Sequence, residues 1–415
     1  MANNQLALDT FTRHNVRFGT VIELNPQHLI GGEFFGNYSD FNFKQDNRIS
    51  LTNQENTLES GQTIFAGYRD LVANNLTINY QWKLDTSGAQ LQVFGDYTGQ
   101  RALWFNTARS TYEQGQYTDN EERNNTDNRT QIFSVQTDWL QPISSAIKLE
   151  AGLKWSRIDR KNALVSEFFE QESWIENDRS TAFNYLEEIS GIYGTISNQL
   201  DERHFLKLGL RIEHTQLEKQ DLLDASLIEQ NYLNWFPSAF ISRKLSDKNS
   251  LTLSYTKRIR RPPFAFLNDN IRKYNDFRYE LGNPDLQPEY RHRYELGLQL
   301  NKDHFALFYS QTNDAINGIY YLEGEIAYYQ KFNEGSQKQW GIEYNRTGRL
   351  TPWWDIQARG QLFRRRFTDA NGQDIFHQTT LKVRVINTFK LNQTTSVEVF
   401  ANYYSPQADA YFIRE

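Results

Sequence analysis

The sequence predicts an all-β fold, a transmembrane antiparallel β-barrel with about sixteen strands present in the chain. Three observations lead to this prediction: apolar and polar residues alternate in many segments, short and long connections alternate between those segments, and 14% of the residues are aromatic. Successive side chains of a strand point to opposite faces, so each segment offers an apolar face to lipid and a polar face to a lumen. Aromatic girdles at the two membrane interfaces account for the surplus of Tyr, Phe and Trp.

The strand segments follow one another with two kinds of connection between them. The predicted short turns are at residues 25–28, 85–88, 141–146, 201–203, 246–249, 301–304, 350–353 and 391–395. The predicted long, polar connections are at residues 44–69, 106–128, 160–181, 262–288, 317–325 and 368–376. Because antiparallel strands joined in this way put all short turns on one rim, the long connections share the other rim, as in outer-membrane barrels. No linker divides the chain, so residues 1–415 are predicted to form one domain.

The pair of strands predicted over residues 251–260 and 289–300 has the clearest alternation. In both, aliphatic and aromatic residues occupy every second position, and mostly polar or charged residues occupy the positions between. The aromatic residues lie nearest the connecting loop, as expected for a strand that passes from a membrane interface into hydrocarbon. The charged residues expected to face the lumen are Arg258, Arg260, Arg291, Arg293 and Glu295.

Composition and motifs do not favour catalysis. The chain has no run of about 18 apolar residues that could form a transmembrane helix. It has no Cys, its seven His are scattered, and it lacks the metalloprotease, hydrolase, P-loop and dinucleotide motifs. We therefore expect no enzyme activity, no cofactor and no metal site, and a net charge of -6 gives no sign of a nucleic-acid partner. A soluble β-rich carbohydrate enzyme is an alternative, but its pair of carboxylates cannot be identified by spacing.

One specific motif, G-N-P-D-L-Q-P-E, occupies residues 282–289. Its characteristic residues are Gly282, Asn283, Pro284, Leu286, Pro288 and Glu289. Gly282 can adopt a positive φ, and the residues before the two prolines are driven toward extended geometry. Pro288 lies where a strand is predicted to begin, so its missing N–H costs no ladder hydrogen bond. The motif therefore predicts a structural role, the rigid start of a strand.

Together with L-S-Y-T-K-R-I-R-R-P at residues 253–262, this motif resembles the barrel of TonB-dependent outer-membrane receptors, in particular the outer membrane protein β-barrel family. Further matching segments are N-Y-S-D at 37–40, W-F-P-S at 235–238, T-N-D-A-I at 312–316, K-F-N-E-G-S-Q-K-Q-W-G-I-E at 331–343 and N-Y-Y-S-P at 402–406. The resemblance implies a place in the bacterial cell outer membrane, in contact with its lipid, and energy-coupled uptake of a ligand too large for porins. External loops would capture the ligand, and an inner-membrane complex of the TonB type would displace a plug. The lumen charges would contact that plug or line the path; an ordinary lumen network is the alternative.

Both ends of the chain are expected to be truncated relative to that family. Residues 1–20 contain neither a basic leader nor an apolar signal core. The family's plug domain, energy-coupling box and terminal aromatic strand are not found in the sequence. We therefore expect the barrel portion of a longer receptor whose complete barrel has about 22 strands. A plugless structural or adhesion barrel is the alternative function, and the ligand stays open because selectivity lies in variable loops.

Overall fold

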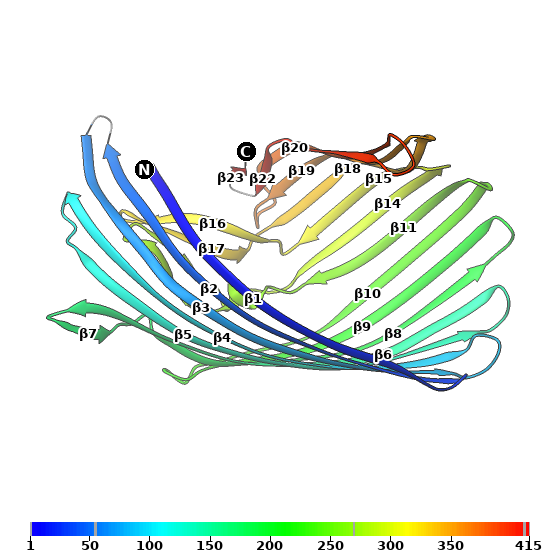
Figure 1. Ribbon diagram of the computed structural model, residues 1–415, viewed down its shortest axis with the longest axis horizontal. Helices are drawn as coiled ribbons and strands as arrows, with labels where there is room; N and C mark the ends of the chain where they lie inside the picture. Colours follow the sequence, from blue (N-terminus) through cyan, green and yellow to red (C-terminus); the bar gives the residue numbers. More distant parts are fainter. Residues whose placement is uncertain (1, 54–55, 269, 410–411, 415) are drawn as a thin grey trace.

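The structure, a computed structural model, describes residues 2–53, 56–268, 270–409 and 412–414. Its main element is a 17-stranded antiparallel sheet that curves into a trough (Figure 1). Apart from the short β7 (Ser173–Glu176), which pairs with the end of β6, the strands follow one another in chain order. They are β1 (Ala2–Asn25), β2 (His28–Asn53), β3 (Asn56–Lys83), β4 (Gln90–Gln114), β5 (Asn120–Pro142), β6 (Ile147–Glu170), β8 (Thr181–Gln199), β9 (His204–Asp221), β10 (Leu227–Ser246), β11 (Asn249–Arg260), β14 (Glu289–Leu300), β15 (Asp303–Asn313), β18 (Ser336–Thr351), β19 (Trp354–Thr368), β20 (Asp374–Lys390) and β21 (Ser396–Tyr404). This meander confirms the predicted fold class and strand count.

The two edges of the sheet are β1 and β21. Within the described ranges, β1 pairs with β2 alone and β21 with β20 alone, so the trough is open between these edge strands. Beyond β21, the short strands β22 (Gln407–Asp409) and β23 (Phe412–Arg414) pair with each other.

Short turns gather at one rim of the trough and long hairpins at the other (Figure 1). At the first short turn after β3, Asp85 accepts hydrogen bonds from the backbone N–H groups of Ser87 (2.8 Å) and Ala89 (3.1 Å). Gly88, with φ of 96°, supplies the left-handed residue that this reversal needs. The predicted gathering of the short turns at one rim is therefore confirmed.

Three predicted polar connections are largely strand. Residues 44–69, 106–128 and 160–181 mostly continue β2 to β6 and the start of β8, so reading them as loops was wrong. A strand needs about 9–11 residues to cross a bilayer, whereas β3, with 28 residues, extends far beyond that length. Outside the membrane both faces of a strand can be polar, which hides the period-two pattern in composition.

The outer face of the sheet carries an apolar belt. Leu208 on β9, Ile192 on β8 and Leu253 on β11 are 43%, 55% and 54% exposed. A contiguous exposed apolar surface of this kind is unfavourable in water, whereas contact with lipid removes it from water. Toward the long-loop rim the belt gives way to charge, with an outward ion pair between Arg101 and Asp127 (2.8 Å). The belt therefore marks the membrane-facing part of the wall.

Two long connections fold back into the trough. The first, after β11, contains α1 (Phe264–Leu267), β12 (Arg272–Asn275) and β13 (Arg278–Leu281). The second, after β15, contains β16 (Ile316–Glu323) and β17 (Ile326–Asn333). Together they form a separate sheet in the order β12-β13-β17-β16, with β13 and β17 parallel. Its strands β16 and β17 are labelled inside the trough in Figure 1. We call β12, β13, β16 and β17 the inner sheet.

Helices contribute little to the fold. In the part of the chain that the structure describes, no helix is long and apolar enough to cross a membrane.

An apolar cluster fixes the inner sheet and α1 to the wall. Phe183 and Tyr185 on β8 pack with Leu267 of α1, with Leu286, and with Ile316 at the start of β16. Phe183 and Leu286 are each only 1% exposed. Full burial of one such side chain stabilises a fold by about 1.5–3 kcal/mol, so this cluster is a substantial anchor for the inner sheet.

Candidate functional site

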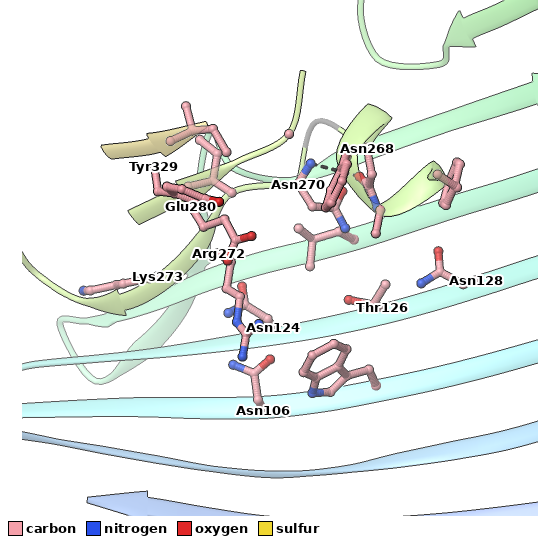
Figure 2. A pocket seen from close by; sticks show the side chains of 18 of the residues that line it. Asn106, Asn124, Thr126, Asn128, Asn268, Asn270, Arg272, Lys273, Glu280 and Tyr329 are labelled. Atoms are coloured by element: carbon pink, nitrogen blue, oxygen red, sulfur yellow. Dashed lines mark hydrogen bonds between the residues drawn. The ribbon is translucent and has the colours of Figure 1, made fainter. Parts of the chain in front are cut away.

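A cavity of about 320 Å³ lies between the wall and the two connections that fold into the trough (Figure 2). Its volume is at the lower end of the range of small-molecule sites. The amide and hydroxyl residues that line it are Asn106, Asn124, Thr126, Asn128, Asn268 and Asn270. The aromatic residues are Phe65, Trp104, Phe264, Phe266 and Tyr329, and the charged residues are Arg272, Lys273, Glu280 and Lys331.

Strands β4 and β5 supply the polar wall of the cavity. Asn124, Thr126 and Asn128 are alternate residues of β5, so they share one face of the strand. Asn106 lies on the neighbouring β4, where it is paired in register with Asn124 (Figure 2). The sequence predicted a solvated loop at residues 106–128, and these site residues were missed. The alternation of Asn124, Thr126 and Asn128 was the sequence signal that could have found them.

The connection after β11 supplies the opposite side of the cavity. Arg272 on β12 points toward β4 and β5, with its guanidinium carbon 6.0 Å from the centre of the Trp104 ring (Figure 2). The same carbon lies 4.7 Å from the Tyr274 ring. Lys331 on β17 lies over the rings of Phe266 and Tyr329, at 5.3 and 5.1 Å. Among the described residues neither cation forms an ion pair, so each retains its charge for another partner.

A buried ionic cluster holds this connection against the wall. The Lys273 side chain is 4% exposed and forms ion pairs with Glu122 on β5 (2.8 Å) and with Asp276. Glu122 also accepts from Arg179 at 2.8 Å, and the Tyr112 hydroxyl donates to Asp276. A buried charge is costly unless it is paired, so Lys273 ties the position of β12 to that of β4 and β5.

These groups lie beyond the membrane-facing belt, and their pKa values shift in opposite directions. Burial alone would raise the pKa of Asp276, but Lys273, Tyr112 and Asn120 stabilise its carboxylate, and the net shift is below its ordinary value of 3.8. Burial alone would lower the pKa of Lys273, but Glu122 and Asp276 raise it above 10.5. The ionised carboxylate of Asp276 stabilises the folded state fully above the pKa of the free carboxyl. This stabilisation is lost as pH falls through the lowered pKa of Asp276 in the folded protein. The charged ammonium group of Lys273 stabilises the folded state fully below the pKa of the free amine. This stabilisation is lost as pH rises through the raised pKa of Lys273 in the folded protein.

We therefore expect the first inward connection to dock over the middle pH range and to loosen at both extremes, below 3.8 and above 10.5. An environment-sensitive dye on a single cysteine at Asp285, an exposed position of this connection, reports the docking, since the chain has no other Cys. Lys273→Met should abolish the alkaline transition. An unchanged alkaline transition in that variant would contradict the assignment.

The predicted motif joins the two connections of the inner sheet. The side chain of Asn283 donates to the backbone oxygen of Lys331 on β17 (2.8 Å). Glu289 accepts from the backbone N–H of Ile316 (3.0 Å) and pairs with Arg260 (2.8 Å). Pro288 immediately precedes β14, in agreement with the expected strand start.

Three other motif residues lie along the same segment. Leu286 is buried in the apolar cluster, and Pro284 follows the hydrogen-bonded Asn283. Gly282 does not have the expected positive φ. A Cβ atom there would lie 1.6 Å from the carbonyl oxygen of Asn268, so close approach of the backbone requires this glycine.

The predicted lumen charges share the concave face of β11 and β14. Arg293 donates to Glu295 (2.7 Å) and to Glu343 on β18 (3.0 Å), and Arg291 donates to Ser310 (3.3 Å). Arg260 pairs with Glu289, and Arg258 lies exposed beside Arg291 in register. Contact of these residues with a plug stays a prediction. No group of three or more potential metal ligands gathers anywhere in the described ranges.

An apolar outer belt around a curved antiparallel wall with a polar inner face defines an outer-membrane β-barrel. The chain belongs to the outer membrane protein β-barrel family, whose model matches residues 82–415. This places the protein in the bacterial outer membrane and confirms the resemblance in the sequence. A comparison with curated protein sequences gives no match.

Solved structures similar to this chain include siderophore receptors. The siderophore receptor PiuA from Acinetobacter baumannii has a TM-score of 0.61 at 12% identity, with 97% of this chain and 71% of that chain covered. The ferric-catecholate import receptor Fiu from E. coli K12 has a TM-score of 0.57 at 11% identity, with 97% and 71% covered. The alcaligin outer-membrane receptor FauA from Bordetella pertussis has a TM-score of 0.55 at 17% identity, with 97% and 68% covered. At these identities the similarity shows a shared fold.

Proposed function

We propose that residues 1–415 form the barrel domain of an outer-membrane receptor that captures a ligand and imports it with energy from the inner membrane. The observation that carries the proposal is the cavity, which two external connections form with the wall on the loop side of the apolar belt. A rigid wall that presents loops over a cavity is a common arrangement of binding sites. The proposed partners are a plug domain, which the charges of β11 and β14 would contact, and an energy-coupling complex of the TonB type.

Growth of the source bacterium tests this proposal. A strain that lacks the gene is compared with its parent on a panel of media that each supply a single source of carbon, iron or another metal. We expect normal growth on complete medium and failure on one source, restored by the wild-type gene. Collapse of the proton gradient should then stop accumulation of that nutrient while surface binding persists.

The alternative of a plugless structural or adhesion barrel gives the opposite result. Growth of the two strains would be equal on every source, and loss of the gene would alter envelope integrity or attachment instead. Accumulation that persists without a proton gradient would also contradict energy-coupled import.

A further inference from the structure

We propose that the cavity binds an acidic saccharide, that is, a hydroxyl-rich ligand that carries a carboxylate or sulfate group. This inference rests on the proposed receptor function and names the chemical class of the ligand. The geometry that carries it combines a wall of amides, aromatic rings that line the cavity and, among the described residues, buried polar atoms without hydrogen-bond partners and an arginine without an ion pair.

The amide wall matches hydroxyl groups. Asn106, Asn124 and Asn128 lie on adjacent strands around the cavity, and Asn268 and Asn270 lie across from them (Figure 2). Each amide side chain offers both donors and an acceptor. The side-chain oxygens of Asn268 and Asn270 already accept hydrogen bonds within the protein. A hydroxyl group likewise donates and accepts, so a ligand dense in hydroxyls can pair with the donors and acceptors that the amides of β4 and β5 offer. A ligand with acceptors alone would leave the side-chain oxygen of Asn128 unpaired.

The cavity contains buried hydrogen-bond donors and a buried acceptor, three polar atoms in all. The indole N–H of Trp104 and the side-chain N–H₂ of Asn106 are donors, and the side-chain oxygen of Asn128 is an acceptor. All three are buried without a hydrogen-bond partner within the described part of the chain. A buried polar group without a hydrogen-bond partner destabilises the ligand-free protein. A ligand that both donates and accepts at these positions removes that destabilisation.

Aromatic rings and an arginine complete the match. The rings of Trp104 and Tyr329 line the cavity, and a flat ring offers an apolar face to the C–H groups of a sugar. Arg272 points at the amide wall and has no carboxylate partner among the described residues. Its planar guanidinium suits a carboxylate or sulfate, to which it can donate two parallel hydrogen bonds. Glu280 lies opposite Arg272 in the β12–β13 pairing but forms no ion pair with it, and its carboxylate accepts from the hydroxyl of Tyr274 at 2.6 Å.

Binding is measured on the protein purified from outer membranes in detergent. The probes are a panel of uronate-, sialate- and sulfate-bearing oligosaccharides, their neutral counterparts, and the iron complex ferrichrome. We expect at least one acidic oligosaccharide to bind more tightly than its neutral counterpart. Binding of ferrichrome with no acidic oligosaccharide bound would overturn the inference, as would binding of none of the probes or equal binding of the acidic and neutral forms.

Matched variants locate the site. Asn128→Leu should weaken binding of the acidic saccharide about 10-fold or more, since a hydrogen-bond partner is replaced by an apolar group. Asn125→Leu is the control, because Asn125 lies three residues away on the same strand, exposed on the opposite face. Equal weakening by both variants would contradict the site.

Arg272→Gln should reduce the preference for the acidic over the neutral saccharide about 10- to 100-fold, as expected for loss of a charged hydrogen bond. Arg129→Gln, on the outward face of β5, should leave that preference unchanged. Arg272 is exposed on β12, so its replacement leaves the fold intact, and circular dichroism verifies the β-sheet content of every variant. An unchanged preference in Arg272→Gln overturns the inference.

The binding measurement and the growth test can contradict the two proposals independently of each other. If gene loss abolishes growth on an iron source and no acidic saccharide binds, the receptor function stands and the saccharide inference is wrong. If an acidic saccharide binds in the cavity and its accumulation does not depend on the gene, the binding inference stands and the import function is wrong.

Discussion

Replacing Lys273 by alanine is expected to release the first inward connection, between β11 and β14, from the wall of the trough. Its ammonium group is almost fully buried between Glu122 and Asp276. Removing one partner of a buried ionic cluster costs about 3–5 kcal/mol, because the remaining charges stay buried without compensation. The lower end of this range applies here, because Glu122 still forms its ion pair with Arg179 and Asp276 still accepts a hydrogen bond from Tyr112.

Hydrogen exchange of the backbone amides in α1, β12 and β13 measures this release. We expect faster exchange there, together with unchanged protection in the membrane-spanning parts of β8 and β9. Lys244→Ala is the matched control, because Lys244 forms a single exposed ion pair with Asp247 at the opposite rim (2.8 Å). Exposed ion pairs of this kind contribute little to the stability of the fold. Equal effects of the two variants, or no change in exchange for Lys273→Ala, would show that Lys273 does not anchor the connection.

The sequence predicted the wall of the trough well because its pattern is local. Alternating residues define each crossing strand, and turn residues such as Asp85 and Gly88 act within a few positions of themselves. The inner sheet has no such local signal. Its parallel ladder pairs Tyr279 with Tyr328, which lie far apart in the chain, and no short-range pattern encodes that pairing.

The candidate site was missed for a related reason. Asn106, Asn124 and Asn128 occupy strands that extend beyond the membrane, where the inward face is as polar as a loop. Polarity alone therefore suggested an irregular connection. The motif was recognised from sequence, but the need for glycine at position 282 was not. Glycine is needed because the carbonyl of Asn268 lies close by, and that proximity depends on tertiary structure.

Leu208→Arg is expected to destabilise the barrel in lipid by about 2–4 kcal/mol, the cost of an arginine at the midplane of a barrel wall. Leu208 lies between Leu206 and Leu210 on the outward face of β9, near the middle of the apolar belt, and is 43% exposed. In register it faces Ile196 on β8 and Ala239 on β10, so no polar partner adjoins it on either neighbouring strand.

The preceding residue on the same strand provides the control. Lys207 points to the inner face, where its ammonium group lies 3.1 Å from Glu150 on β6, and Lys207→Arg can keep this ion pair. Both variants introduce an arginine into β9 one position apart, so strand propensity and chain position are matched. Urea titration of the protein folded into lipid vesicles measures the free energy of unfolding. A large loss for Leu208→Arg with almost none for Lys207→Arg is the expected result, and equal losses would contradict the assignment of Leu208 to the lipid face.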